Sequence, residues 1–210
     1  MINVDNLSLT IKRKVILDNI NLEVKRGSIV GLIGRNGSGK TMLMKCICGF
    51  VKPTYGTITA DGKLVGKEID FPENMGLIIE TPTFINYYSG YKNLKILSGY
   101  KKLIGEEKIV EVLKKVWLYD ERKKPVMKYS LGMKQRLAIA QAIMEDPELL
   151  VLDEPMNGLD KHGVEEMRKL FQKLKDSGKT IILASHNKDD IEILCDHVYE
   201  MELGTMTKVR

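Results

Sequence analysis

The eight residues from 34 to 41 constrain the fold of this chain more than any other segment. They read Gly-Arg-Asn-Gly-Ser-Gly-Lys-Thr, which matches the pattern G-x-x-x-x-G-K-[ST]. A mostly apolar run, residues 28–33, precedes them, and a segment with helical propensity, residues 41–48, follows. The sequence therefore predicts a buried strand, a glycine-rich loop and a helix, in that order.

Such a loop is suited to binding phosphate groups. Glycines let successive backbone N–H groups curl around phosphate oxygens, and the N-terminus of the following helix adds partial positive charge. We expect Lys40 to reach the β- and γ-phosphates of a nucleotide and the Thr41 hydroxyl to be a ligand of Mg²⁺. The predicted nucleotide-contacting residues of this segment are Gly34, Arg35, Asn36, Gly37, Ser38, Gly39, Lys40, Thr41 and Met42. Taken alone, the loop could also be a glycine-rich turn that matches the pattern by chance.

Composition is that of an ordinary soluble globular protein. The chain has 210 residues, of which 43% are hydrophobic and 29% are charged, and a net charge of +5. We interpret the small basic excess as a solvated surface and expect no nucleic-acid partner. No apolar run approaches the roughly 18 residues that span a bilayer, and residues 1–5 are not typical of a signal peptide. Together with only three irregularly spaced cysteines, these features predict a cytoplasmic protein.

Hydrophobic patterning elsewhere predicts an α/β fold in a single domain. Segments with strand character are residues 2–10, 20–25, 57–62, 75–79, 149–152 and 180–184. The first two alternate apolar and polar residues and suggest an N-terminal antiparallel β layer, whereas the later runs suggest buried, mostly parallel strands. Residues 82–145 are predominantly helical in pattern, with apolar side chains at three- and four-residue spacing at Ile109, Val112, Leu113, Val116 and Trp117. We therefore predict a core of residues 1–81 and 146–210 with an inserted helical subdomain, 82–145.

Two adjacent carboxylates follow the apolar run at 149–152. Asp153 and Glu154 would lie at the carboxyl end of a buried strand, where open α/β sheets place their ligand sites. We expect Asp153 to hold Mg²⁺ through its water shell and Glu154 to orient and deprotonate a water that attacks a phosphoryl group. The alternative is that these acids, followed by Pro155, only form a turn and cap a helix.

With these motifs in place, the whole chain resembles the ATP-binding cassette (ABC) ATPases. Residues 129–136, Tyr-Ser-Leu-Gly-Met-Lys-Gln-Arg, are similar to the family's LSGGQ signature and retain its serine and second glycine at Ser130 and Gly132. Residues 157–160, Asn-Gly-Leu-Asp, resemble the D-loop and end at Asp160. His186 matches the switch histidine that contacts the γ-phosphate in this family.

The resemblance implies a P-loop NTPase core that binds ATP with Mg²⁺ and hydrolyses the ATP. The catalytic residues would be Lys40, Glu80, Glu154 and His186. It also implies a head-to-tail pair of subunits, in which Ser130 and Gly132 complete the partner's nucleotide site. Both residues stand where a helix is expected to begin, and a helix N-terminus attracts anions. Asp160 is counted with them among the nucleotide-site residues.

Two positions depart from the family pattern. Ile11 stands where the family has an aromatic residue that stacks on adenine, so the stacking contribution of roughly 1 kcal/mol is lost. We therefore expect modest ATP affinity or relaxed base choice. Glu80 stands where the family has the Q-loop glutamine, and a carboxylate is repelled by the γ-phosphate unless Mg²⁺ lies between them. We predict that Glu80 approaches the metal only in the closed state; a solvated loop acid is the alternative.

The segments 80–84 and 129–136 narrow the resemblance to the subgroup that serves bacitracin resistance and lantibiotic immunity. This implies the motor of a peptide-antibiotic exporter, attached to the inner face of the membrane through a multi-span permease and paired as a homodimer. A soluble ABC ATPase with a non-membrane partner, or a non-transporting ATP-dependent switch, are the alternatives. The tyrosines at 87, 88 and 91 could form a groove for a permease helix or belong to the core of the helical subdomain.

Overall fold

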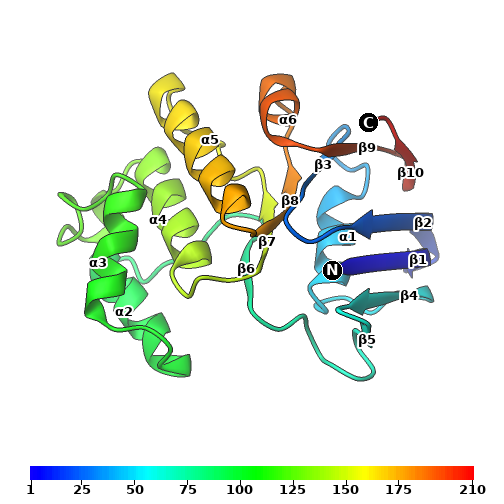
Figure 1. Cartoon of the computed structure of the whole chain (residues 1–210), viewed down its shortest axis with the longest axis horizontal. Coiled ribbons are helices and arrows are strands. Elements are labelled where there is room, and N and C mark those ends of the chain that lie inside the picture. Colours follow the sequence, from blue (N-terminus) through cyan, green and yellow to red (C-terminus); the bar gives the residue numbers. More distant parts are fainter.

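A computed structural model describes the chain over residues 1–210 and shows two β-sheets with helices around them (Figure 1). The larger sheet has the strand order β10-β9-β3-β8-β7-β6. Its strands are β3 (Ile29–Ile33), β6 (Met75–Ile78), β7 (Leu149–Asp153), β8 (Thr180–Ala184), β9 (His197–Glu202) and β10 (Thr205–Lys208). All of them are parallel except β10, which pairs antiparallel with β9 at one edge. Because parallel strands share a direction, the loops that follow them meet at one edge of the sheet.

The smaller sheet is antiparallel and has the order β2-β1-β4-β5. Its strands are β1 (Ile2–Ile11), β2 (Lys14–Val24), β4 (Tyr55–Ala60) and β5 (Lys63–Leu64). Helix α1 (Lys40–Ile47) packs in the same apolar cluster as this sheet and as Val30 and Leu32 of β3. The predicted N-terminal antiparallel layer is therefore confirmed, and α1 bridges it to the parallel sheet.

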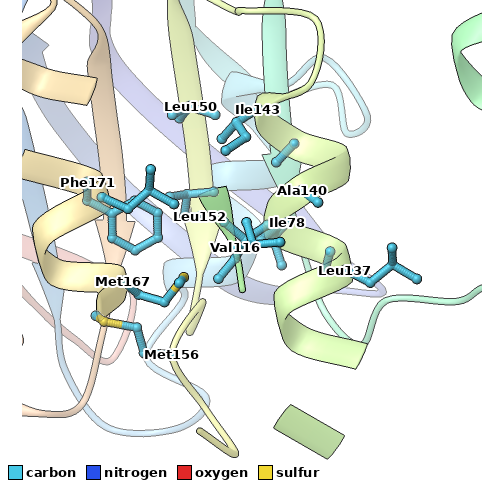
Figure 2. Packing of buried hydrophobic residues seen from close by; sticks show 14 of the residues in the cluster. Ile78, Val116, Leu137, Ala140, Ile143, Leu150, Leu152, Met156, Met167 and Phe171 are labelled. Carbon is cyan, nitrogen blue, oxygen red and sulfur yellow. The ribbon is translucent and has the colours of Figure 1, made fainter. Parts of the chain in front are cut away.

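Alternation along β7 places its side chains in two separate cores. Leu149 and Val151 are buried with α1 and the antiparallel sheet, whereas Leu150 and Leu152 are buried with the helices on the other face. Figure 2 shows Leu150 and Leu152 between α4 and α5, with Leu152 beside the ring of Phe171. The central sheet is thus covered on both faces, as the uninterrupted apolar run in β7 indicates.

The helices between β6 and β7 fall within the segment predicted as a helical insertion. They are α2 (Gly90–Lys101), α3 (Glu106–Lys115), the 3₁₀ helix η1 (Val126–Lys128) and α4 (Leu131–Ile143). Of these, α4 does not belong to a peripheral lobe alone, because Ile143 lies beside Leu150 of the central sheet (Figure 2) and a Cβ on Gly76 of β6 would lie 1.9 Å from the Ala142 carbonyl oxygen. The remaining helices are α5 (Lys161–Asp176) and α6 (Lys188–Leu194), which lie after β7 and β8.

The predicted α/β class, with a mixed and mostly parallel sheet, is confirmed. The prediction omitted the short elements β5, α6, β9 and β10, and it extended the helical pattern of α3 too far. Trp117 lies beyond the end of α3, in the left-handed region at φ 54°, and is half exposed. None of the helices combines the length and apolar character that crossing a membrane requires.

The three cysteines are buried and form no disulfide. Burial raises the pKa of the Cys46 thiol to about 12, and it has the same effect on Cys48 and Cys195. A thiol whose pKa is raised in the folded chain keeps its proton where the unfolded chain loses it. Folding stability therefore falls as the pH rises from the ordinary thiol pKa toward about 12.

We expect Cys46→Ala to make stability less sensitive to alkaline pH. At one pH unit above the ordinary thiol pKa, each buried thiol lowers the free energy of unfolding by about 1.4 kcal/mol. The variant should lose about that much less stability than the wild type between pH 8 and pH 10, measured by urea unfolding. Leu43→Ala is the control, because it leaves a cavity at a buried position but removes no titrating proton. It should keep the wild-type pH dependence. Parallel curves for all three proteins would contradict the prediction.

Candidate functional site

A cavity of about 650 Å³ opens where the phosphate loop meets the ends of β6 and β7. The loop and the first turn of α1 line it with residues 36–42. The segment 80–82 after β6 forms a second wall, and Asp153 and Glu154 at the end of β7 form a third. These groups come from distant parts of the sequence, so the parallel sheet is what assembles them.

Glycine conformations shape the phosphate loop. Gly34, Gly37 and Gly39 have φ values of 140°, 81° and 111°, which side chains rarely permit. A Cβ on Gly34 would lie 2.2 Å from the carbonyl oxygen of Met201 in β9. The loop is therefore held tightly against the end of a neighbouring strand, and Gly34 is required there by both conformation and space.

Lys40 and Ser38 carry polar groups inside this loop. The Lys40 side chain is largely buried, and its Nζ donates to the carbonyl oxygens of Gly34 at 2.6 Å and Arg35 at 3.2 Å. The Ser38 hydroxyl is buried and has no hydrogen-bond partner within the chain. An unpaired buried hydroxyl and a buried ammonium in one loop suit an anionic ligand, because both groups would gain a charge-assisted hydrogen bond.

Thr41 and Asp153 are in direct contact. The Thr41 hydroxyl donates to Asp153 Oδ2 at 2.6 Å, which joins the start of α1 to the end of β7. Hydroxyl and carboxylate oxygens are hard donors of the kind that Mg²⁺ prefers. The chain contains no cluster of three or more His, Cys, Asp or Glu side chains arranged around a metal. A cation at this pair would therefore take its other ligands from phosphate and water, as is usual for Mg²⁺.

Glu154 and His186 form a second polar pair next to the first. Glu154 Oε2 lies 2.8 Å from His186 Nδ1, and the Glu154 backbone N–H donates to the carbonyl oxygen of Ala184 at 2.9 Å. Glu154 adopts the left-handed region with φ 49°. Because Ala184 ends β8, two neighbouring strand ends fix the acid and the histidine together.

Glu80 is held by a residue that the sequence did not predict. Glu80 Oε1 lies 2.6 Å from Lys45 Nζ, and the Glu80 side chain is 64% exposed. Glu80 lines the cavity, but its side chain is paired with Lys45. The Thr41 hydroxyl at the candidate metal site is bonded to Asp153 instead. A sequence signal for Lys45 exists, since it follows Thr41 by one helical turn and so shares its face of α1.

Three predicted nucleotide-site residues of the signature and the D-loop, Ser130, Gly132 and Asp160, lie outside this cavity. Ser130 caps α4, where its hydroxyl accepts from the Met133 N–H at 3.2 Å, and Asp160 caps α5 by accepting from the Gly163 N–H at 2.8 Å. Neither of them lines the cavity, and Gly132 does not line it either, whereas the signature residues Leu131, Lys134 and Gln135 do. The structure therefore brings the phosphate loop, Asp153, Glu154, His186 and Glu80 together but not Ser130, Gly132 or Asp160.

Ile11 is not part of the cavity either. It ends β1, is 40% exposed, and the cavity is instead lined by Ile16 of β2. A Cβ on Gly39 would lie 3.3 Å from the Ile16 carbonyl oxygen, which shows how closely β2 passes the phosphate loop. Ile16 is thus the apolar side chain at this wall of the cavity, and the contact of Ile11 with the base stays a prediction.

A phosphate loop at the carboxyl edge of a parallel sheet, facing an Asp-Glu pair on another strand, defines a P-loop nucleotide-binding protein. Comparison with known proteins specifies the family. Residues 17–157 match the family model described as ABC transporter. The chain belongs to the ABC transporter family and is one of its ATP-binding, ATP-hydrolysing subunits.

Individual relatives agree with this assignment. The chain is 40% identical to the bacitracin transport ATP-binding protein BcrA of Enterococcus faecalis, over 99% of this chain and 68% of BcrA. It is 38% identical to the lantibiotic transport ATP-binding protein SrtF of Streptococcus pyogenes, over 94% of this chain and 85% of SrtF. A solved ATP-binding subunit of an ABC transporter superposes with a TM-score of 0.88 at 26% identity, covering 100% of this chain and 90% of the other. The predicted similarity to the bacitracin and lantibiotic subgroup is confirmed.

We expect Gly34→Ala to be far more damaging than Gly37→Ala. An alanine at Gly37 would meet no atom within 4 Å, so only its left-handed conformation is penalised, by about 1–2 kcal/mol. At Gly34 the overlap with Met201 adds about 1–3 kcal/mol, because the conflicting atom is backbone. Urea unfolding measures both losses. Equal losses in the two variants would show that contact with β9 does not restrict the loop.

Proposed function

We propose that this chain is the ATP-driven motor of a transporter that exports a peptide antibiotic or protects against one. The observation that carries the catalytic part is the Glu154–His186 contact beside the Thr41–Asp153 pair at the edge of the cavity. The cargo part rests on similarity to proteins named for bacitracin and lantibiotic transport. A non-hydrolysing switch would have no need of the Glu154–His186 contact, which favours the motor.

In this proposal the chain's own residues position ATP and remove one proton. Lys40 leaves the carbonyl oxygens of its loop for the phosphates, and the free Ser38 hydroxyl donates to a phosphate oxygen. Thr41 and Asp153 would hold Mg²⁺, which neutralises phosphate charge when bound. Glu154 accepts a proton from the water that attacks the γ-phosphorus, while His186 orients the Glu154 carboxylate. The bond to the β-phosphate oxygen breaks, and ADP and phosphate are formed.

We further propose that two copies pair head to tail. Ser130 is exposed at the N-terminus of α4, a helix of 13 residues, and is free to face a second chain. The first N–H groups of a helix attract anions, so Ser130 and Gly132 suit the γ-phosphate of ATP bound to the partner. Asp160, at the start of α5, belongs to the same proposed interface.

The membrane partner is proposed to be a multi-span permease, with this chain on its cytoplasmic side. Tyr87 is an exposed aromatic residue that is available for such contact. Tyr88 and Tyr91 are only partly exposed, and Lys92 Nζ lies 3.6 Å above the Tyr88 ring. The docking role is therefore best supported for Tyr87, and the other two serve partly as packing residues.

Replacing the proposed base tests the catalytic assignment. We expect Glu154→Gln to lower steady-state ATP hydrolysis by about 10²–10⁴-fold, because an amide cannot accept the proton. ATP binding, measured by calorimetry, should be retained. Glu165→Gln, which removes an exposed acid from α5, should hydrolyse ATP like the wild type. Normal turnover by Glu154→Gln would refute its role as the base.

Glu80 is proposed to move from Lys45 toward the metal when the site closes around ATP. If so, Glu80→Gln should hydrolyse ATP more slowly and require more Mg²⁺ for half-maximal rate, because a neutral amide attracts the cation less. The measurement is ATPase rate against Mg²⁺ concentration, with Glu73→Gln as an exposed-acid control. An unchanged rate and Mg²⁺ requirement would identify Glu80 as a solvated loop acid.

A further inference from the structure

The buried amide of Gln135 connects α4 to the loop that carries Glu154. Gln135 is only 6% exposed. Its Nε2 donates to the carbonyl oxygen of Pro155 at 2.8 Å and to that of Glu154 at 3.3 Å. A buried amide that loses its acceptors is penalised by about 1–3 kcal/mol. This contact is therefore a specific attachment between a helix and a loop that are 20 residues apart in the chain.

Glu154 needs such an attachment because its backbone is strained. A residue other than glycine in the left-handed region is destabilised by about 1–2 kcal/mol and stays there only if its surroundings hold it. On one side, the Glu154 N–H is bonded to Ala184 of β8. On the other side, the Glu154 carbonyl oxygen receives the Gln135 amide. The peptide groups that aim the carboxylate at His186 are thus held from two elements.

Residues on either side of Gln135 strengthen the contact between α4 and the segment after β7. Arg136 Nη2 pairs with Glu166 Oε2 of α5 at 2.7 Å, and both side chains are mostly buried. A Cβ on Gly132 would lie 3.1 Å from the Gly158 carbonyl oxygen, so the D-loop backbone touches the start of α4. Met156 in this loop is buried in the same apolar core as Leu137 and Ile139 of α4. A shift of α4 must therefore displace the loop or break these contacts.

We propose that Gln135 is a positioning residue that makes the placement of Glu154 depend on the position of α4. The inference rests on the proposed function, in which Ser130 and Gly132 at the start of α4 contact ATP bound to the partner subunit. Gln135 lies little more than one helical turn beyond Ser130. Occupancy of one nucleotide site would then determine how well the base of the other site is placed.

The test replaces Gln135 by Met, which has a similar shape but no amide. We expect Gln135→Met to lower kcat by about 10-fold or more, because misplacement of a reacting group by about 1 Å can reduce rates about 10²-fold. KM for ATP and ATP affinity should stay within about twofold, since Gln135 binds backbone rather than the phosphate loop. Gln141→Met is the matched control: it lies on the same helix, and its side chain makes no hydrogen bond. It should retain the wild-type kcat.

A double-mutant cycle separates positioning from general damage. If Gln135 acts through Glu154, Gln135→Met should cause no further loss of single-turnover rate in a Glu154→Gln background. Additive losses would overturn the proposal, as would a wild-type kcat in Gln135→Met. A wild-type chain without ATPase activity would instead refute the proposed function itself.

If Gln135→Met fails to fold, Gln135→Glu takes its place in the test. Glutamate keeps the length of the side chain, but its ionised carboxylate accepts hydrogen bonds and donates none. Failure of both to fold would also overturn the proposal, because Gln135 would then be a folding residue.

Discussion

The register of three parallel strands determines where every reactive group of this chain lies. Ala184 of β8 is level with Leu32 of β3 on one side and with Asp153 of β7 on the other. The phosphate loop, the acid pair and His186 all begin within two residues of that level. A slip of one residue would turn Leu150 and Leu152 away from their core, so the alternation of buried side chains enforces the register. Hydrophobic packing on both faces of the sheet thus sets the geometry of the chemistry at its edge.

Backbone strain is concentrated at the same edge. Glu80 and Glu154 both have positive φ. Glu80 lies two residues after the end of β6, and Glu154 directly follows the end of β7. Such conformations persist only where other contacts over-determine them. Glu154 has three such contacts, from Ala184, His186 and Gln135, whereas the exposed Glu80 side chain has one partner, Lys45. This difference in anchoring is consistent with a fixed base and a mobile second carboxylate.

Local motifs were predictable from the sequence because their chemistry lies within a few consecutive residues. The phosphate loop, the Asp153–Glu154 pair and the Ser130 cap each follow from residue type and spacing, and the structure has each where it was expected. The presence of Ile16 in the cavity wall could not be predicted in the same way, because it depends on how the β1–β2 hairpin lies against the loop. The Lys45–Glu80 pair joins residues 35 positions apart and is likewise a product of tertiary packing.

Helix α4 shows most clearly what sequence periodicity does not reveal. Its apolar residues indicate a helix, and we assigned that helix to an inserted subdomain, yet Ile143 lies beside Leu150 of the central sheet (Figure 2). Leu131 and Gln135 are four residues apart and therefore share a face, and that face lines the chain's own cavity. Ser130 and Gly132, on the same turn, do not line it. One rigid element can therefore present residues both to its own catalytic loop and to a second chain, and a displacement of α4 at either face is felt at the other because a helix moves as a unit.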